Sequence, residues 1–371
     1  MRMDHSEARD IGERLAALEA VLPRKGRVLI FTHDYPDPDA LAAAGALHLL
    51  LEKRFHLRSR IVFSGTAERA ENRELLRHFR YKWSHADQLH VPKRTLRALF
   101  VDCQPWSGNI SVPKFARPVA VFDHHPMLRD HSRPGLFIDL RPRMGACASV
   151  LQEYLAACDI TPPPWLASCL VYAILAETID FTRGFQPLDR EAYLALSGRA
   201  NLRMLGRIRN APLPQLYFSL LQEAIANTRL YGRIAWSHLP EVPQPEIIAD
   251  IADRLARLER ISWSFCSGLH AGRLIVSLRS SRRDARCGKL LQRAFHGEGS
   301  AGGHDRMAAG SLDVSHLSGE ERTKRVEEIT LRLLKQLDRR HAQRTDTDEI
   351  QTRPLARVEE PTAPDAPAQP D

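Results

Sequence analysis

Three short apolar runs in the first half of the chain each end in acidic or histidine side chains. The runs are 27–31, 96–101 and 118–122, and after them come His33, Asp102 and Asp123-His124-His125. Apolar runs of this length that stop at polar residues are typical of buried strands in an α/β sheet. Ligands of an open α/β sheet gather at the carboxyl ends of its strands. Packing does not readily explain three strands that deliver acids and histidines to one edge, so the sequence predicts a functional site there.

Helical patterns alternate with these strands. We expect helices at 6–21, 39–55, 70–79, 146–157 and 165–179, and a further strand at 61–64. This alternation predicts an α/β domain with a mainly parallel sheet flanked by helices. A second, smaller α/β domain is expected from strands at 230–237, 261–268 and 273–279 and helices at 246–259, 286–295 and 318–339.

The domain boundaries follow from this pattern. We expect an N-terminal helix within 1–24, a first domain over 25–188, a linker of helix and loops over 189–214 and a second domain over 215–340. The active-site cleft is expected between the two domains. From residue 341 to 371 the chain is acidic and rich in proline, a composition that cannot bury apolar surface. That tail is predicted to be disordered.

Charge and composition narrow the class of protein. The formal net charge is +8, but residues 341–371 contribute a net of −4, so the preceding 340 residues carry +12. A surplus of this kind suits a polyanionic partner. The six cysteines form no CxxC pair, which predicts reduced thiols and no zinc ribbon. No apolar run reaches the roughly 18 residues of a membrane span, and the charged N-terminus lacks the apolar stretch of a signal peptide. We therefore expect a cytoplasmic protein without a membrane partner.

The segment after the first strand holds His33, Asp37 and Asp39. Carboxylates together with imidazole suit divalent ions such as Mn²⁺ or Mg²⁺. The alternate spacing of Asp37 and Asp39 could let each carboxylate address a different ion. Aspartates also cap helices, however, and Asp39 could simply cap the helix that follows it.

Further candidate ligands lie at the ends of later elements. Asp102 follows a strand directly and is a natural bridging ligand, since each of its oxygens can take one metal ion. An acid followed by two histidines, Asp123-His124-His125, is uncommon at a strand end. Asp180 follows an apolar helix, where a carboxylate is unfavourable against the helix dipole unless a cation is present. Glu177, in the same helix, is expected either to be structural or to contact the metal ligands rather than the metal itself.

The second domain carries a glycine-rich segment, Gly302-Gly303-His304. Adjacent glycines let backbone N–H groups approach a phosphate closely, and His304 can add a hydrogen bond. Upstream, Arg279 ends a strand and is suited to bidentate phosphate binding, with Ser281 just beyond it. A flexible turn with an incidental histidine is the competing interpretation.

With these motifs in this order, the chain resembles the DHH/DHHA1 phosphoesterase superfamily over roughly residues 25–315. Within it, the chain is most similar to the bacterial nanoRNase/pAp-phosphatase group and to cyclic-dinucleotide phosphodiesterases. The first-domain signatures are His33/Asp37/Asp39, Asp102, Asp123-His124-His125 and Asp180, and the second-domain signature is Gly302-Gly303-His304. Five motifs in this order are highly specific, although Ala301 stands where many members have another glycine.

The resemblance implies a role for each matching residue. One ion would be held by His33, Asp37, Asp102 and Asp180, and the other by Asp39, Asp102 and His124. His125 would contact the scissile phosphate, and Asp123 would orient the histidines. Arg279, Ser281, Gly302, Gly303 and His304 would hold the phosphates of the substrate.

The implied activity is hydrolysis of short nucleotides, such as nanoRNA (pApA), pAp or cyclic dinucleotides, by two-metal activation of a bridging water. The expected cofactors are two divalent ions, Mn²⁺ first, with Mg²⁺ or Co²⁺ as alternatives. The expected partners are short oligoribonucleotides or nucleotides, and the group also admits a homodimer. Two other functions stay open: an inorganic pyrophosphatase or polyphosphatase with the same first domain, and a non-catalytic nucleotide sensor.

Overall fold

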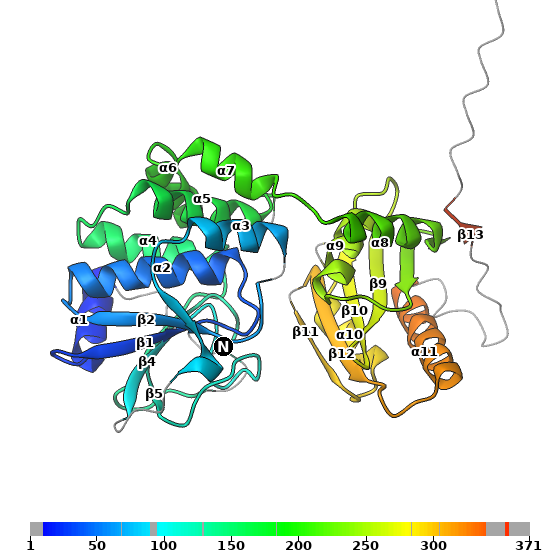
Figure 1. Cartoon of the computed structure of the whole chain (residues 1–371), viewed down its shortest axis with the longest axis horizontal. Coiled ribbons are helices and arrows are strands. Elements are labelled where there is room, and N and C mark those ends of the chain that lie inside the picture. Colours follow the sequence, from blue (N-terminus) through cyan, green and yellow to red (C-terminus); the bar gives the residue numbers. More distant parts are fainter. Residues whose placement is uncertain are drawn as a thin grey trace, which may run out of the picture. The chain divides into compact units, whose positions relative to one another are not determined.

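The computed structural model describes residues 10–67, 69–89, 95–127, 130–182, 184–282, 284–303, 305–338 and 353–355. The chain divides into two compact units, Met1–Pro212 and Leu213–Asp371 (Figure 1).

The first unit is built on a six-stranded sheet in which every pairing is parallel. Its strands are β1 (Arg27–Phe31), β2 (Arg58–Phe63), β3 (Trp83–His85), β4 (Leu96–Val101), β5 (Ala116–Asp123) and β6 (Phe137–Leu140). They lie in the order β3-β2-β1-β4-β5-β6. The direction of winding therefore reverses between β1 and β4, and such a reversal opens a crevice at the carboxyl ends of the strands.

Alternating side chains of each strand enter different cores. In β1, Val28 and Ile30 join the main core with the helices, whereas Leu29 and Phe31 pack on the opposite face. The helices are α1 (Ile11–Val21), α2 (Pro38–Lys53), α3 (Ala70–His78), α4 (Cys147–Ala157), α5 (Pro164–Thr178), α6 (Pro187–Ser197) and α7 (Leu202–Arg209), with a 3₁₀ turn η1 (Ala86–Gln88). Loop residues such as Trp106 and Phe115 cover the opposite face. The parallel α/β architecture predicted from the sequence is thus confirmed.

Helix α2 is the centre of the main core and follows the first site segment directly. Twelve of its sixteen residues are buried, and most of these are alanine or leucine. Small side chains let α4 and α5 approach α2 closely. A Cβ atom on Gly45 would come within 2.9 Å of Leu166 Cδ1 and 3.1 Å of Phe79 Cε2, so a larger residue would have to displace these side chains. This packing fixes the N-terminal end of α2, where Asp37 and Asp39 lie.

Two helices occupy most of the segment 189–214 that we expected to be a linker. Ala192 and Leu196 of α6 and Met204 and Ile208 of α7 are buried in the main core of the first unit. Their apolar faces bind this segment to α5 and α3. The segment is therefore part of the first unit up to Pro212.

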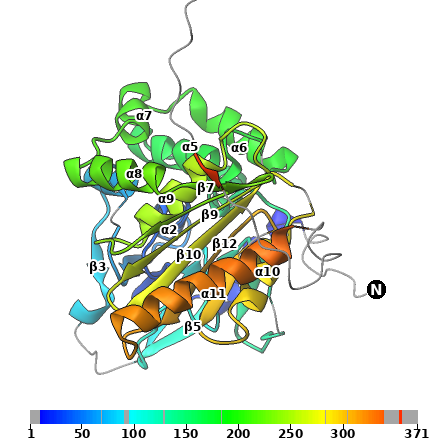
Figure 2. The same ribbon diagram turned by 90° about the vertical axis from the view of Figure 1, so that its right-hand side faces the viewer.

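The second unit holds a seven-stranded sheet of mixed direction. Its strands are β7 (Arg229–Tyr231), β8 (Ile234–Leu239), β9 (Trp263–His270), β10 (Arg273–Ser280), β11 (Ser300–Gly303), β12 (Met307–Asp313) and β13 (Arg353–Pro354), in the order β11-β12-β10-β9-β8-β7-β13. Only the β8–β9 pairing among them is parallel. Helices α10 (Cys287–Ala294) and α11 (Gly319–Leu337) share one core with the sheet, and α8 (Gln215–Ala226) and α9 (Glu246–Leu255) share another. Figure 2 shows α11 lying across the strands.

Most of the tail predicted to be disordered, residues 341–371, lies outside the described residues. Its described part is ordered, because β13 pairs with β7 and Leu355 packs against the core beneath α8 and α9.

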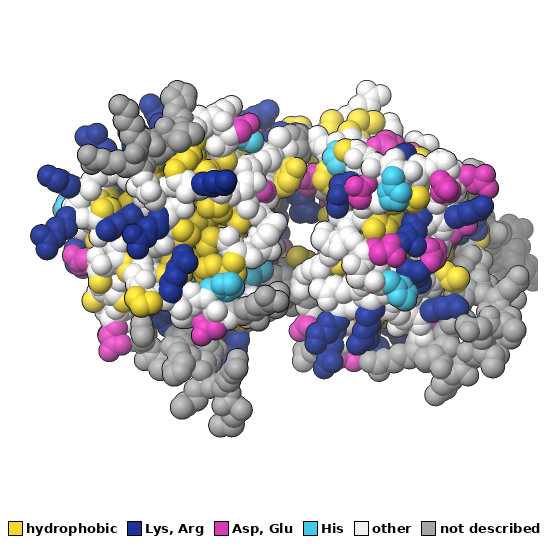
Figure 3. Space-filling model, turned by 90° about the horizontal axis from the view of Figure 1, so that it is seen from below, with side chains coloured by type: hydrophobic (Ala, Val, Ile, Leu, Met, Phe, Trp, Pro, Cys, Tyr) yellow, Lys and Arg dark blue, Asp and Glu magenta, His cyan; other side chains and the backbone are white. Residues whose placement is uncertain are grey.

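The surface matches the charge surplus of the sequence. Figure 3 shows Lys and Arg side chains over both units on the face in view. Among the described residues, none of the helices combines the length and the apolar character needed to cross a bilayer.

Candidate metal centre

The predicted ligands of the first unit meet beyond the carboxyl ends of β1, β4 and β5. His33 follows β1, Asp102 follows β4, and His124 follows β5, so the residues lie at the reversal of the sheet order. Asp102 leaves β4 in the left-handed region, with φ of +56°, a conformation that aspartate tolerates better than most residues. Its backbone N–H donates to the Phe122 carbonyl over 2.9 Å, which ties the turn to β5.

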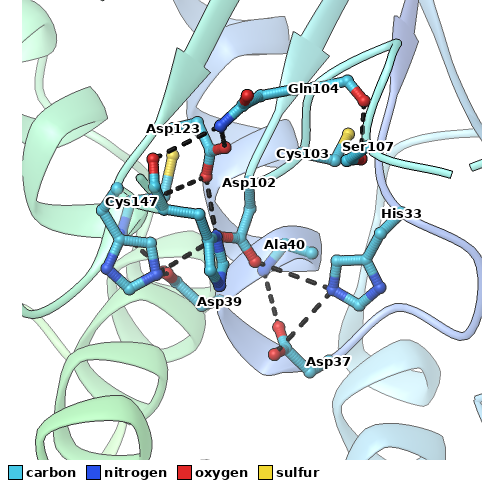
Figure 4. A network of polar contacts seen from close by, with 12 residues as sticks. His33, Asp37, Asp39, Ala40, Asp102, Cys103, Gln104, Ser107, Asp123 and Cys147 are labelled. Atoms are coloured by element: carbon cyan, nitrogen blue, oxygen red, sulfur yellow. Dashed lines mark hydrogen bonds and ion pairs between the residues drawn. The ribbon is translucent and has the colours of Figure 1, made fainter. Parts of the chain in front are cut away.

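Asp102 stands at the centre of the cluster (Figure 4). Its Oδ2 lies 3.6 Å from His33 Nε2, and its Oδ1 lies 3.3 Å from His124 Nε2. The same Oδ1 is 3.6 Å from His125 Nδ1. Although Asp102 is buried, Oδ1 accepts no hydrogen bond of normal geometry from the described residues. Such an atom is costly to bury unless a further group meets it.

Backbone carbonyls orient both imidazoles toward Asp102. His33 Nδ1 lies 2.8 Å from the Asp34 carbonyl oxygen, and His124 Nδ1 lies 3.0 Å from the Met144 carbonyl oxygen. A carbonyl can only accept, so each Nδ1 carries a hydrogen, and Nε2 is the atom that can bind a metal ion once it gives up its own proton. This second contact is the usual support of a metal-bound histidine.

Asp37 and Asp39 both cap helices and both face the imidazoles. Asp37 Oδ1 accepts from the Ala40 N–H at the start of α2, and its Oδ2 is 3.9 Å from His33 Nε2. Asp39 caps α4 instead of its own helix: it accepts from the N–H groups of Cys147 and Ala148 over 2.7 and 2.8 Å. Its Oδ2 lies 3.8 Å from His124 Nε2. The capping role and the site role thus coexist in the same two carboxylates.

Asp123 holds His125 rather than His124. Its Oδ1 accepts from both the backbone N–H and Nδ1 of His125, over 3.1 and 2.8 Å. The side chain of His125 is 41% exposed, in contrast to the buried His124. Gln104 donates from Nε2 to Asp123 Oδ2 over 2.8 Å and accepts from Trp106 Nε1. Sequence reasoning missed Gln104, because a glutamine three residues after a strand end carries no pattern of its own.

The described contacts do not bring Asp180 to the cluster. Its Oδ2 forms an ion pair of 2.6 Å with Arg209 Nη2, and the side chain is 53% exposed. The charge of Glu177, which lies one turn earlier at the end of α5, instead contributes to raising the pKa values of Asp39 and His124. The structure therefore places Glu177 nearer to the predicted metal ligands than the sequence suggested.

Electrostatics bind the cluster together. Burial alone would lower the pKa values of His33 and His124, but the surrounding carboxylates, Asp102 first among them, together outweigh it and raise both pKa values well above the usual range. Burial opposes ionisation of Asp102 as well, yet the contacts with His124 and His33 lower its pKa. Burial, and then the charge of Asp102, raise the pKa of Asp39. Protons or a cation must neutralise this surplus of acid.

The donor atoms fit divalent metal ions. Two groups each offer ligand atoms within 4.8 Å of one another: Asp102, His124 and His125, and His33, Asp37 and Asp102. Carboxylate and imidazole donors are those of Mn²⁺, Mg²⁺ and Co²⁺ sites. Both groups share Asp102, and its buried Oδ1 is the unmet acceptor that a cation would satisfy.

In the second unit, Arg279 is already engaged. It ends β10, is buried, and forms a two-point ion pair with Asp253 of α9, while its Nη1 donates to Ser277 Oγ over 2.8 Å. The backbone N–H of Ser281 donates to the Ser262 carbonyl over 3.1 Å. If Arg279 binds a phosphate, it does so while Asp253 holds its guanidinium group in place.

The predicted glycine loop is partly a strand. Gly302 and Gly303 end β11, which pairs with β12. Gly303 has φ of +139°, and a Cβ atom there would lie 2.3 Å from the Met307 carbonyl oxygen, so the hairpin itself requires glycine. Gly302 has open space where its Cβ would be. His304 lies outside the described residues.

Known proteins share this architecture. No family model matches the chain. It is 30% identical over 292 residues to an uncharacterized protein of Methanocaldococcus jannaschii, covering 78% of this chain and 59% of that protein. It is 22% identical over 153 residues to a probable manganese-dependent inorganic pyrophosphatase of Streptococcus pyogenes, covering 41% of this chain and 49% of the other. The chain thus spans about half to three fifths of the length of these curated relatives.

Among solved structures, an exopolyphosphatase-related protein of Bacteroides fragilis superposes with a TM-score of 0.63 at 14% identity, covering 88% of this chain and 97% of that one. The likeness extends over both units. It shows that the chain shares the fold of that protein, and together with the order of the motifs it supports the predicted resemblance to the DHH/DHHA1 phosphoesterase superfamily.

Proposed function

We propose that this chain is a metal-dependent phosphodiesterase or phosphatase that hydrolyses short nucleotides. The observation that carries the proposal is the position of Asp102. One carboxylate oxygen faces His33 Nε2 and the other faces His124 Nε2, which is the arrangement of a carboxylate shared by two ions. When bound, two divalent ions would lower the pKa of a water between them and stabilise charge on the phosphate oxygens.

The residues divide the task between them. His33, Asp37 and Asp102 would hold one ion, and Asp39, Asp102 and His124 the other, with Asp180 as a further proposed ligand. The carbonyls of Asp34 and Met144 keep both imidazoles in the tautomer that presents Nε2.

His125 is positioned to bind the substrate rather than an ion. Its Nδ1–H donates to Asp123, so Nε2 is the ring nitrogen that this contact does not use. Burial lowers the pKa of His125, but the contacts with Asp123 and Asp102 together outweigh it and raise that pKa, which favours the imidazolium. A cationic N–H at this point would donate to a phosphate oxygen and stabilise the charge that develops there.

The preference for nucleotides rests on the second unit. Arg279, Ser281, Gly302, Gly303 and His304 match the substrate-binding positions that the resemblance implies. The resemblance assigns the pyrophosphatase alternative a different second domain without the Gly-Gly-His segment, whereas the exopolyphosphatase-related protein superposes on both units and so does not separate a nucleotide from a polyphosphate substrate. The names of the relatives, a manganese-dependent pyrophosphatase and an exopolyphosphatase-related protein, support phosphate chemistry with Mn²⁺ as the first choice of metal.

A panel of substrates tests the proposal. The protein is incubated with Mn²⁺ and, separately, pApA, pGpG, pAp, a cyclic dinucleotide, a longer RNA and inorganic pyrophosphate, with a chelator-treated control for each. We expect hydrolysis of the short nucleotides that the chelator abolishes. Faster turnover of pyrophosphate would replace the proposal by the pyrophosphatase alternative, and comparable rates on long RNA would contradict a short-substrate site. Binding without turnover of any substrate would indicate a sensor.

A further inference from the structure

A cavity lies in the first unit, where the C-terminal end of α3, the N-terminal end of α5 and helix α7 meet. Its volume is about 580 Å³, which is within the range of small-molecule sites. Four of its ten lining residues are arginines, Arg77, Arg80, Arg203 and Arg207, and none is an acid. Figure 1 shows α7 beside α3 and α5.

This cavity is separate from the metal centre. Trp165, which lines it, is at the start of α5, whereas Glu177, which acts on Asp39 and His124, is at the end of that helix. Twelve residues of helix separate them, which corresponds to about 18 Å. A ligand in the cavity would therefore not touch the predicted metal ligands.

The arginines carry charge that the protein leaves largely unbalanced. Within the described part of the chain, Arg80, Arg203 and Arg207 form no ion pair, while Arg77 pairs with Glu74 over 2.9 Å. Arg203 and Arg207 are four residues apart on α7, where like charges repel. An anion between them would relieve this repulsion and gain charge-assisted hydrogen bonds.

The aromatic side chain of Trp165 also lines the cavity. The Trp165 ring is half-buried and is held by edge-to-face contacts with Phe79, at 5.6 Å between centroids, and Tyr81, at 4.9 Å. Met204, buried on α7, adds an apolar contact. Helix α5 begins here with Pro163 and Pro164 and has no side-chain cap, so the positive end of its dipole is not met by a side chain.

We propose that this cavity binds a nucleotide, with its phosphates against Arg80, Arg203 and Arg207 and its base against Trp165. An inorganic polyanion would use the arginines but not the ring. A planar base with attached phosphates satisfies both, since base stacking on an aromatic side chain tolerates any base. The site is independent of the proposed hydrolysis at Asp102.

Calorimetric titration of the full-length protein with ADP, in the presence of a chelator, tests the proposal. The chelator removes metal-dependent binding at Asp102. We expect one binding event that weakens about tenfold or more in Arg203→Ala/Arg207→Ala, because charged hydrogen bonds to phosphate are lost. The matched control is Arg190→Ala/Arg199→Ala, which removes the same charge from exposed positions of the first unit outside the cavity. That control and Asp102→Asn are expected to keep the ADP affinity of the wild type.

Ligand comparison tests the role of the ring. Inorganic pyrophosphate is expected to bind about tenfold more weakly than ADP, because stacking on an aromatic side chain is worth about 1–3 kcal/mol per base. Equal affinity for pyrophosphate, or equal losses in the two double variants, would overturn the nucleotide site, as would the absence of ADP binding. Hydrolysis of pApA with Mn²⁺ by Arg203→Ala/Arg207→Ala is expected to match the wild type, so failure of this site and failure of the proposed function are distinguishable.

Discussion

Gln104 Nε2 donates to Asp123 Oδ2 over 2.8 Å, on the side of the carboxylate opposite to the oxygen that holds His125. The amide therefore fixes the carboxylate that fixes the imidazole. Trp106 Nε1 in turn donates to Gln104 Oε1, which leaves the amide a single orientation. This chain of contacts explains how an imidazole that is 41% exposed can keep one direction.

Gln104→Ala is expected to lower kcat for pApA about tenfold, because supporting contacts behind a site residue are typically worth about 10–100-fold in activity. The loss should fall on kcat more than on KM, since the orientation of His125 matters most in the transition state. Gln88→Ala, an exposed change in the same unit, is the control. Steady-state kinetics with Mn²⁺ checks both variants. Wild-type kcat in Gln104→Ala would show that Asp123 holds His125 unaided.

Asp102→Asn is expected to abolish Mn²⁺-dependent hydrolysis, because an amide cannot give one anionic oxygen to each of two ions. The melting temperature of the wild type should rise when Mn²⁺ replaces chelator, since a ligand that binds only the native state stabilises it. That rise should be lost in the variant. Activity and thermal melts with Mn²⁺ or chelator measure both effects.

The matched control for this change is Asp159→Asn. Asp159 has φ of +54°, close to the +56° of Asp102, so an asparagine must adopt the same backbone conformation at either position. Asp159 is exposed and lies after α4, away from the cluster. Its variant should keep activity and the Mn²⁺-dependent melting shift. Near-normal turnover by Asp102→Asn would remove the basis of the proposed function.

Arg209→Ala is expected to strengthen Mn²⁺ binding if Asp180 is a metal ligand, because the arginine competes for its carboxylate. Both partners are more than half exposed, and such pairs are worth at most about 1 kcal/mol, so the gain should be no more than about fivefold. Arg199→Ala is the control, and Mn²⁺ titration by calorimetry is the measurement. Unchanged affinity in Arg209→Ala together with a large loss in Glu177→Gln would assign the ligand to Glu177 instead.

The sequence predicted the central strands and the cluster around Asp102 because both depend on local patterns. β1, β4 and β5 are apolar and buried over most of their length. The polar residues that follow these strands meet because parallel strands end at the same edge of the sheet. Strand β6 escaped notice because Asp139 interrupts its apolar pattern. That buried carboxylate is matched by Arg141, two residues further along the chain, and by Arg14 of the distant helix α1.

Other features depend on contacts between distant segments. Asp39 accepts hydrogen bonds from Cys147 and Ala148, more than a hundred residues away, so no local pattern could assign it to the cap of α4. The ion pair of Asp180 with Arg209 likewise depends on the packing of α7 against α5. Helix propensity and spacing alone do not encode such pairings.

His238 makes stability depend on pH. Burial lowers its pKa in the folded protein, whereas the unfolded chain takes up a proton near the usual value of about 6.5. The unfolded state therefore binds more protons below that value, so stability is present at neutral pH and falls as the pH drops through about 6.5. His238→Gln should show a smaller loss between neutral and mildly acidic pH than the wild type. Urea midpoints at the two pH values measure the difference, and equal losses would contradict it.

Gly302→Ala and Gly303→Ala separate a substrate role from a structural one. At Gly303 the positive φ and the nearby Met307 carbonyl oxygen forbid a Cβ atom, so alanine should lower the melting temperature and cost about 1–3 kcal/mol. At Gly302 the space is open and the backbone is ordinary, so alanine should fold normally. If a phosphate approaches the Gly302 backbone, the added methyl group should raise KM for pApA without changing the melting temperature. Unchanged KM in a stable Gly302→Ala protein would mean that the glycine pair serves the β11–β12 hairpin alone.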